Sequence, residues 1–447
     1  MLVETPQPPV QRWPRLTVWY LLGLLIPVSF GVKLIWGLSG SFVEPAFLLT
    51  ALLWWRRRRI ARLASLEWLL VMAFCLSAVL AYRHPQLTPE RWLTAWSHTF
   101  RMLALLLLVA VVRTLNDKQL ASLCRGVVHS LFLVLGMSVL VAAIGMSIIP
   151  NVLGIDLSYV DFTDRFVIHL GHFRIPRFFG LFDEPAPFGA FGVASLILFM
   201  VCRSHIHDRL RRIGIVLSCL VVILSMSDQA LIALLVIAAF RKWEVKRHNW
   251  IQRIALPAVV FVAMGPYLAA RLASKATEFS AYSSDVWGTS GAERVLNSVL
   301  ALSLTTQSWW NFLFGIGPSL FGIFLAEWFP VLSDRQQVQF LLPDLLCSVG
   351  IVGLAIAILL GLDWLAQAKR LGNRYCLFAL LAGVMFQSDF KSPALAVAIG
   401  VCLAGTADSQ AEPRPRRFRL LPWRCKHFFR PRGQPDSLTS SQGEPRG

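Results

Sequence analysis

The sequence contains a series of apolar windows about as long as a lipid bilayer is thick, and this feature limits what the chain can fold into. A membrane-spanning helix needs roughly 20 apolar residues. Twelve such windows, several of them short, lie at 16–36, 39–55, 66–82, 97–115, 126–149, 180–202, 212–227, 228–240, 254–272, 343–365, 375–388 and 392–405. The chain is 56% hydrophobic and only 15% charged, which is too apolar for a soluble enzyme of this length. We therefore expect an all-α polytopic membrane protein with about twelve transmembrane helices.

Basic residues gather at alternate ends of these windows. The clusters lie at 12–15, 56–62, 113–125, 203–212, 241–253 and 369–374, and in the tail. By the positive-inside rule, these segments and both termini are cytoplasmic. The formal net charge of +18 therefore follows from topology and gives little support to nucleic-acid binding. The basic faces are expected to meet anionic membrane lipids.

The expected organisation has three parts. A cytoplasmic N-terminus (1–15) precedes a transmembrane domain (16–405), and a basic, proline-rich tail (406–447) is expected to be disordered or to lie on the inner membrane surface. The first apolar window is expected to act as an uncleaved signal anchor, because the residues before it are too polar for a cleavable signal peptide. The eight cysteines show no CxxC or Cys/His spacing, so neither a disulfide framework nor a zinc site is indicated.

Two predicted outer loops, about 150–179 and 273–342, are longer than the other connections. Extended loops between packed helices usually carry function. In the second loop, residues 291–310 have helical apolar spacing that is broken at Thr305–Ser308, and residues 312–329 are apolar with three glycines. We expect helices there that lie along the outer leaflet or dip into it.

Arginines stand out among the charges of these loops. Arg174 and Arg177 lie in the first loop, Arg271 borders the second, and Arg294 lies within it. An arginine stays charged when partly desolvated and can grip a phosphate with two parallel hydrogen bonds. The expected ligand is a diphosphate-bearing lipid. Arg177 and Arg294 are the best placed, because each directly precedes a membrane-apposed segment.

The acids beside these arginines allow two interpretations. Asp183 and Glu184 could serve as a general base at the hydrocarbon boundary. Followed by Pro185, they could equally cap the amino end of a helix, and the cap is the favoured interpretation. Asp228, in "SMSDQA", is either a turn acid between two paired spans or a polar group inside the bundle, with the turn favoured.

The sequence offers no convincing metal or cofactor site. His169 and His172 could meet on a helix, but no acid or cysteine completes a ligand set. An outer D-x-D, a phosphate-binding Gly-x-x-x-x-Gly-Lys and a Gly-x-Ser-x-Gly are all missing from the sequence. We therefore expect chemistry without metal or cofactor.

Residues 165–365 resemble the bacterial O-antigen ligase and Wzy-type polysaccharide polymerase superfamily. The resemblance rests on motifs in the family's order: "RFFGLFDEPAPFGAF", "ILSMSDQALIALLVIAAF", "GAERVLNSVLAL", "NFLFGIGPSLFG" and "DLLCSVGIVGLAIAILLG". They are similar to the entry into a span, a serine-rich turn, an arginine-bearing helix, a glycine-rich turn and the following span.

The resemblance implies a glycosyltransferase of the bacterial inner membrane that takes a glycan from undecaprenyl diphosphate at the periplasmic face. Arg177 and Arg294 would hold the diphosphate and stabilise its departure, and Glu184, Asp183 or Glu293 would be the base that activates the acceptor hydroxyl. Arg174, Arg271, Asp183, Gly315 and Gly317 would contribute to substrate binding. A chain-length regulator and a flippase of the same pathway are the implied protein partners.

The chain departs from the family pattern in two places, and the first departure bears on the choice between polymerase and ligase. The ligases carry a histidine before the span that follows the large loop, whereas this chain has none between Arg271 and Leu365. The serine-rich turn has Asp228 and Gln229 where an arginine is common. The missing histidine favours a polymerase over a ligase. A lipid-linked oligosaccharide flippase is the alternative from another class, but it would need polar residues through the midplane.

Overall fold

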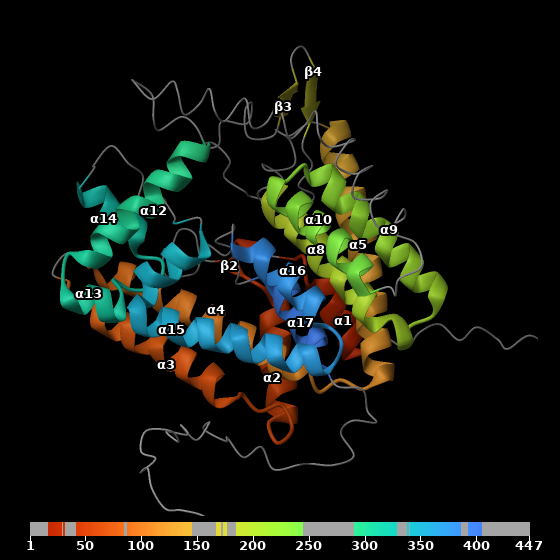
Figure 1. Cartoon of the computed structure of the whole chain (residues 1–447), viewed down its shortest axis with the longest axis horizontal. Coiled ribbons are helices and arrows are strands. Elements are labelled where there is room, and N and C mark those ends of the chain that lie inside the picture. Colours follow the sequence, from red (N-terminus) through yellow and green to blue (C-terminus); the bar gives the residue numbers. More distant parts are fainter. Residues whose placement is uncertain are drawn as a thin grey trace, which may run out of the picture.

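The computed structural model describes residues 17–28, 30–31, 42–84, 87–144, 167–170, 173–176, 185–244, 290–328, 338, 340–385 and 392–404. These residues are predominantly helical, as expected (Figure 1). The first helices are α1 (Val18–Leu25), α2 (Pro45–Arg57), α3 (Ser65–Ala81), α4 (Pro89–Val112) and α5 (Asp117–Ile144). The next are α8 (Pro185–Val201), the 3-10 turn η1 (Cys202–Ser204), α9 (Asp208–Ser225) and α10 (Asp228–Glu244). The last are α12 (Ser290–Thr306), α13 (Trp309–Phe314), α14 (Phe321–Trp328), α15 (Leu341–Arg370), α16 (Arg374–Met385) and α17 (Pro393–Cys402).

Two short antiparallel strand pairs accompany the helices, and the expected all-α class is confirmed, because these strands have only two to four residues each. Strands β1 (Phe30–Gly31) and β2 (Phe42–Val43) pair with each other, so the predicted span 16–36 is wrong in extent, because α1 ends at Leu25. Strands β3 (Val167–Leu170) and β4 (Phe173–Pro176) form a hairpin within the first predicted outer loop.

Among the described residues, three helices are long and apolar enough to span a membrane. They are Arg91–Val112, Asp117–Leu140 and Leu341–Arg370, judged by length and composition. Five further apolar helices have 10–17 residues. The structure therefore contains apolar helices of a membrane protein, whereas the predicted count of twelve spans stays a prediction. The predicted span 254–272 and the tail 406–447 lie outside the described residues.

Local sequence explains where several of these helices begin and end. Thr88 precedes Pro89 at the start of α4 and accepts a hydrogen bond from the Arg91 amide, so one of the unpaired N–H groups of the first turn is satisfied. Helix α12 stops at Thr306, within the predicted break, and the Ser308 hydroxyl then accepts from the Asn311 amide to start α13.

The helix ends sort into two groups. We call the end that carries Arg56–Arg59, Arg62 and Arg113 the basic end. There Arg57 donates to the Thr114 carbonyl over 3.3 Å, and the side-chain amide of Asn373 donates to the Cys402 carbonyl, also over 3.3 Å. Helices α2, α4, α15 and α17 therefore finish at the basic end, whereas α3, α5 and α16 begin there. We call the opposite end, with the carboxyl end of α3 and the turn 315–320, the loop end.

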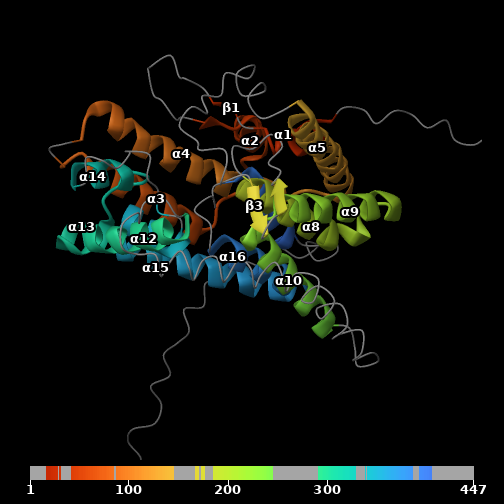
Figure 2. The same cartoon turned by 90° about the horizontal axis from the view of Figure 1, so that it is seen from above.

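The packed helices divide into two sides. Helices α12, α13 and α14 gather on one side and α8, α9 and α10 on the other in both Figure 1 and Figure 2. Helix α16 contacts α8, α10 and α15, so it lies between the two sides. The larger hydrophobic core runs through the bundle, and a smaller one joins α12, the turn 315–320 and α14 to α3 and α15.

Candidate functional site

The structure describes the predicted site residues to different extents. Four lie outside the described residues: Arg177, Asp183, Glu184 and Arg271. For three more, the structure places the backbone but not the side chain: Arg174 in β4, and Glu293 and Arg294 near the amino end of α12. Gly315 and Gly317 are described in full, in the turn between α13 and α14. The site is therefore built from the segments that carry these residues.

The first loop ends in a hairpin and then a helix. Within the hairpin, Arg174 lies opposite His169 in the strand register. This β-structure differs from the helix that the spacing of His169 and His172 would need to form a metal site, and His172 lies outside the described residues. Helix α8 begins at Pro185, whereas the predicted cap residues Asp183 and Glu184 lie outside the described residues. Proline suits this position because the first helical N–H has no partner within the helix.

The entry segment of α8 packs against the serine-rich turn, which brings the first two resemblance motifs together. A Cβ atom on Gly189 would lie 2.7 Å from Ser225 Oγ and 2.7 Å from Ala230 Cβ. The two segments can therefore approach this closely only because residue 189 has no side chain. Met226 has left-handed backbone angles and ends α9, and Asp228 then begins α10. Asp228 is therefore the first residue of α10, and the structure does not describe its side chain.

The glycine-rich turn meets the break in α15, and this contact joins the last two motifs. Gly350 has a φ of 68° inside α15, where the helical geometry is interrupted. A Cβ on Gly350 would lie 2.3 Å from the Leu313 carbonyl oxygen, and one on Gly315 would lie 2.5 Å from the Ser348 carbonyl carbon and oxygen. Two backbones thus touch where two glycines face each other, and both glycines have positive φ.

The carbonyls released at this break have partners. The Ile316 amide donates to the Cys347 carbonyl over 2.8 Å, and the Ser77 hydroxyl of α3 donates to the Ser348 carbonyl over 2.5 Å. Ser348 in turn donates its hydroxyl to Asp344 Oδ1 over 3.2 Å. Because buried backbone groups outside a regular helix need such partners, these contacts fix the glycine-rich turn to α15 and α3.

Aromatic and cationic side chains surround this turn at the loop end. The Arg83 guanidinium lies 4.9 Å from the centre of the Trp310 ring, a cation–π contact. The His84 ring packs edge-on against Phe324, with 4.7 Å between ring centres. Burial and the neighbouring charge of Arg83 lower the pKa of His84 below its usual value. His84 is therefore favoured in its neutral form.

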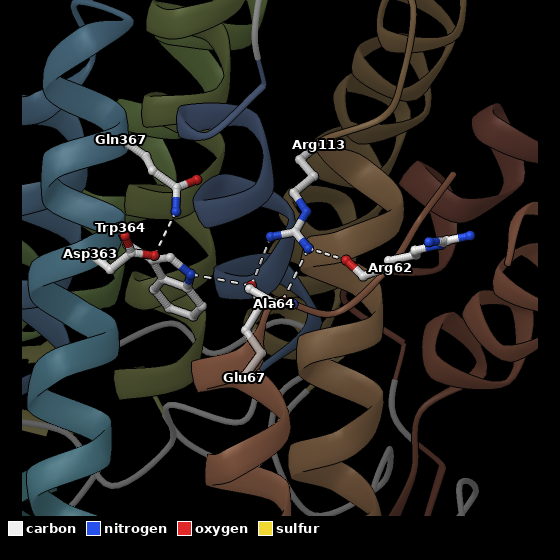
Figure 3. Close-up of polar contacts among 7 residues, drawn as sticks. All are labelled: Arg62, Ala64, Glu67, Arg113, Asp363, Trp364 and Gln367. Atoms are coloured by element: carbon white, nitrogen blue, oxygen red, sulfur yellow. Dashed lines mark hydrogen bonds and ion pairs between the residues drawn. The ribbon is translucent and has the colours of Figure 1, made fainter. Parts of the chain in front are cut away.

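A buried ion pair at the basic end was not predicted from the sequence (Figure 3). The Glu67 side chain has no exposed surface, and its two carboxylate oxygens lie 2.8 and 3.1 Å from Arg113 Nη1 and Nη2. The Ala64 amide and the Trp364 indole N–H also donate to this carboxylate, over 2.6 and 3.3 Å. The network joins α3, α4 and α15, and its partners satisfy a charge that burial would otherwise make costly.

A second ion pair explains how the structure accommodates Arg101, which lies in an apolar window of the sequence. Arg101 of α4 is paired with Glu44, which directly precedes α2. Pairing is the usual solution for a charge at this depth. Glu44 and Arg101 therefore hold α2 against α4 and need no functional role.

Among the described cysteines, Cys75, Cys124, Cys202, Cys219, Cys347 and Cys402 carry free thiols. Within the same portion of the chain, no group of three or more His, Cys, Asp or Glu residues could hold a metal ion.

The resemblance motifs thus form two contacts, Gly189 with Ser225 and Gly315 with Ser348, on opposite sides of α16. The signals for these contacts are the glycines already present in the quoted motifs, although their partners cannot be read from the sequence. In comparisons with known proteins, the chain matches no family model and no curated protein.

Proposed function

We propose that the protein is a metal-independent glycosyltransferase of the bacterial inner membrane. It joins undecaprenyl-diphosphate-linked oligosaccharide repeat units into exopolysaccharide, capsule or O-antigen at the periplasmic face. The proposal includes the twelve-span topology with both termini in the cytoplasm, so that the loop end faces the periplasm and the basic end the cytoplasm.

One structural observation carries the proposal. Four of the resemblance motifs pair two by two, through Gly189 with Ser225 and through Gly315 with Ser348, although each motif alone is a weak signal. Both contacts occur away from the basic end. This arrangement would hold the predicted substrate loops next to the membrane helices, as a reaction on a membrane-embedded lipid donor requires.

The proposed reaction is displacement at the anomeric carbon of the lipid-linked sugar. An acceptor hydroxyl oxygen bonds to this carbon, the bond from the carbon to the diphosphate oxygen breaks, and undecaprenyl diphosphate leaves. Arg177 and Arg294 stabilise the charge on the leaving diphosphate, and a nearby acid takes the hydroxyl proton. The arginines supply the larger contribution, because preorganised donors act most strongly where charge develops in a water-poor site.

The experiment is an assay of the purified protein with a synthetic undecaprenyl-diphosphate repeat unit, with product length read on a gel. A ladder of products is expected. Arg177→Ala and Arg294→Ala should each slow polymer formation about 100-fold or more. Arg91→Ala is the matched control, because Arg91 lies at the amino end of α4 on the loop end and is outside the proposed site. It should leave the rate unchanged.

Other products would identify a different function. A single transfer to a different acceptor would indicate a ligase. Repeat units that accumulate on the cytoplasmic side of cells carrying the arginine variants would indicate a flippase. Equal activity of all three variants and the wild-type protein would remove the arginines from the mechanism.

A further inference from the structure

The turn that joins α2 to α3 carries five arginines in seven residues, Arg56–Arg59 and Arg62. Arg57 is engaged inside the protein, since its guanidinium lies 4.7 Å from the centre of the Trp19 ring and donates to the Thr114 carbonyl. The backbone carbonyl of Arg62 accepts from Arg113, while its side chain points away from the buried ion pair (Figure 3). The internal contacts of the turn therefore leave most of its cations unused.

The remaining cations face outward. Arg56, Arg58, Arg59 and Arg62 are exposed. Among the ion pairs of the described chain, which include the nearby pair of Arg113 with Glu67, none involves these four residues. Four uncompensated positive charges within one turn attract an anion strongly, and arginine suits phosphate in particular.

An apolar surface begins at the same turn. On α2, Leu48, Leu52 and Trp55 are 60, 66 and 64% exposed, and their spacing places them on one helix face. The Arg58 guanidinium lies 4.8 Å from the centre of the Trp55 ring, at the border between this face and the cations. On α3, large exposed apolar residues also continue from the turn: Trp68, Leu69, Met72, Leu76 and Val79. A small soluble anion bound by the arginines would not cover the exposed apolar faces of α2 and α3, whereas the acyl chains of a lipid would.

We propose that the α2–α3 turn is a binding site for an anionic phospholipid. Arg56, Arg59 and Arg62 bind the headgroup phosphate, Arg58 supports it from the Trp55 ring, and the acyl chains cover the exposed faces of α2 and α3. Charge complementarity selects the anionic headgroup, and the adjoining apolar faces select a lipid over a nucleic acid or an acidic protein. The site is separate from the proposed glycan chemistry at the loop end.

The experiment measures lipid adducts of the purified full-length protein by native mass spectrometry. Phosphatidylglycerol is titrated against phosphatidylcholine with the same acyl chains. The wild-type protein should retain phosphatidylglycerol preferentially. The variant R56Q/R59Q/R62Q should bind phosphatidylglycerol about tenfold more weakly or worse, with its weak binding of phosphatidylcholine unchanged.

The control variant R209Q/R212Q/R370Q removes the same charge from exposed residues at the start of α9 and the end of α15. It should change the affinity for phosphatidylglycerol less than about twofold, because arginines on α9 and α15 are not part of the α2–α3 turn and contribute only attraction that salt screens. An equal loss in both variants would refute a specific site and leave only bulk attraction. Equal retention of the two lipids by the wild-type protein would also refute it.

Two further measurements separate the alternatives. The first is competition: inorganic phosphate should not displace phosphatidylglycerol. Displacement at matched concentration would refute the lipid site, because it would show that the turn binds simple anions equally well. The second measurement is thermal unfolding of the wild-type protein in the presence of each lipid, and it does not depend on whether the variants fold. Phosphatidylglycerol should raise its midpoint and phosphatidylcholine should not, and equal shifts would overturn the proposal.

Discussion

Replacing Arg113 by alanine should destabilise the protein strongly, because it leaves the Glu67 carboxylate buried without its cation. Glu67 is fully buried, and both of its oxygens contact the Arg113 guanidinium. Removing one partner of a buried pair costs about 3–5 kcal/mol. The Arg113 side chain keeps 14% of its surface exposed, so water can partly compensate, and the lower value of about 3 kcal/mol is expected.

A second variant tests the reason for this loss. In Glu67→Gln combined with Arg113→Ala, the side chain at 67 carries no charge, so no unpaired ion remains in the core, while the packing lost at position 113 is the same as in the single variant. Its oxygen can still accept from the Ala64 amide or the Trp364 indole. The double variant should recover at least half of the loss, about 1.5 kcal/mol. This recovery would show that the uncompensated charge, rather than lost packing, is the main cause.

The free energy of unfolding can be measured in detergent micelles by denaturant titration followed by circular dichroism. Arg62→Ala is the control, because Arg62 is exposed and contributes only its backbone carbonyl to the network. It should change the free energy by less than about 0.5 kcal/mol. A loss below about 1 kcal/mol for Arg113→Ala, or a double variant no more stable than the single one, would refute the reasoning.

Two further predictions concern the loop end. Gly350→Ala should cost at least about 2 kcal/mol of unfolding free energy, because φ is 68° and the new Cβ would lie 2.3 Å from the Leu313 carbonyl oxygen. Gly361→Ala, with nothing within 4 Å, should be tolerated, and equal thermal stability of the two variants would contradict the close contact. The lowered pKa of His84, caused by burial and by Arg83, means that the unfolded chain binds a proton first as pH falls below about 6.5. This contribution of His84 to stability should therefore be fully present above that pH and decrease below it. Thermal unfolding between pH 8 and pH 5 would measure this decrease, which should be smaller in the His84→Gln variant.

Local signals predicted several element boundaries correctly. Pro185 begins α8 and α12 ends within the predicted break before Ser308, because proline and side-chain capping act on neighbouring backbone groups. Where apolar composition was the only signal, the boundaries were less accurate. The predicted span 16–36 contains a helix that ends at Leu25 and a strand at Phe30–Gly31, because a run of apolar residues does not by itself distinguish one long helix from shorter elements.

The polar contacts inside the bundle were not predictable. Glu67 and Trp364 are 297 positions apart in the chain, and nothing near either residue indicates the other. Arg113 was counted with the basic residues of its predicted inner segment, although it is the partner of the buried Glu67. Whether a charged residue meets solvent, lipid or a buried acid depends on which helices pack together.

The sequence by itself determined the predominantly helical, membrane-type character of the chain and the alternate placement of its basic clusters. Both follow from local composition, since apolar windows of bilayer length and flanking cations act without reference to the rest of the fold. Only the tertiary structure decided that Gly189 meets Ser225, that Gly315 meets the break at Gly350, and that Glu67 is neutralised by Arg113. These contacts arise from close packing between helices distant in sequence, where the absence of a side chain or the presence of one counter-charge decides how near two segments can come.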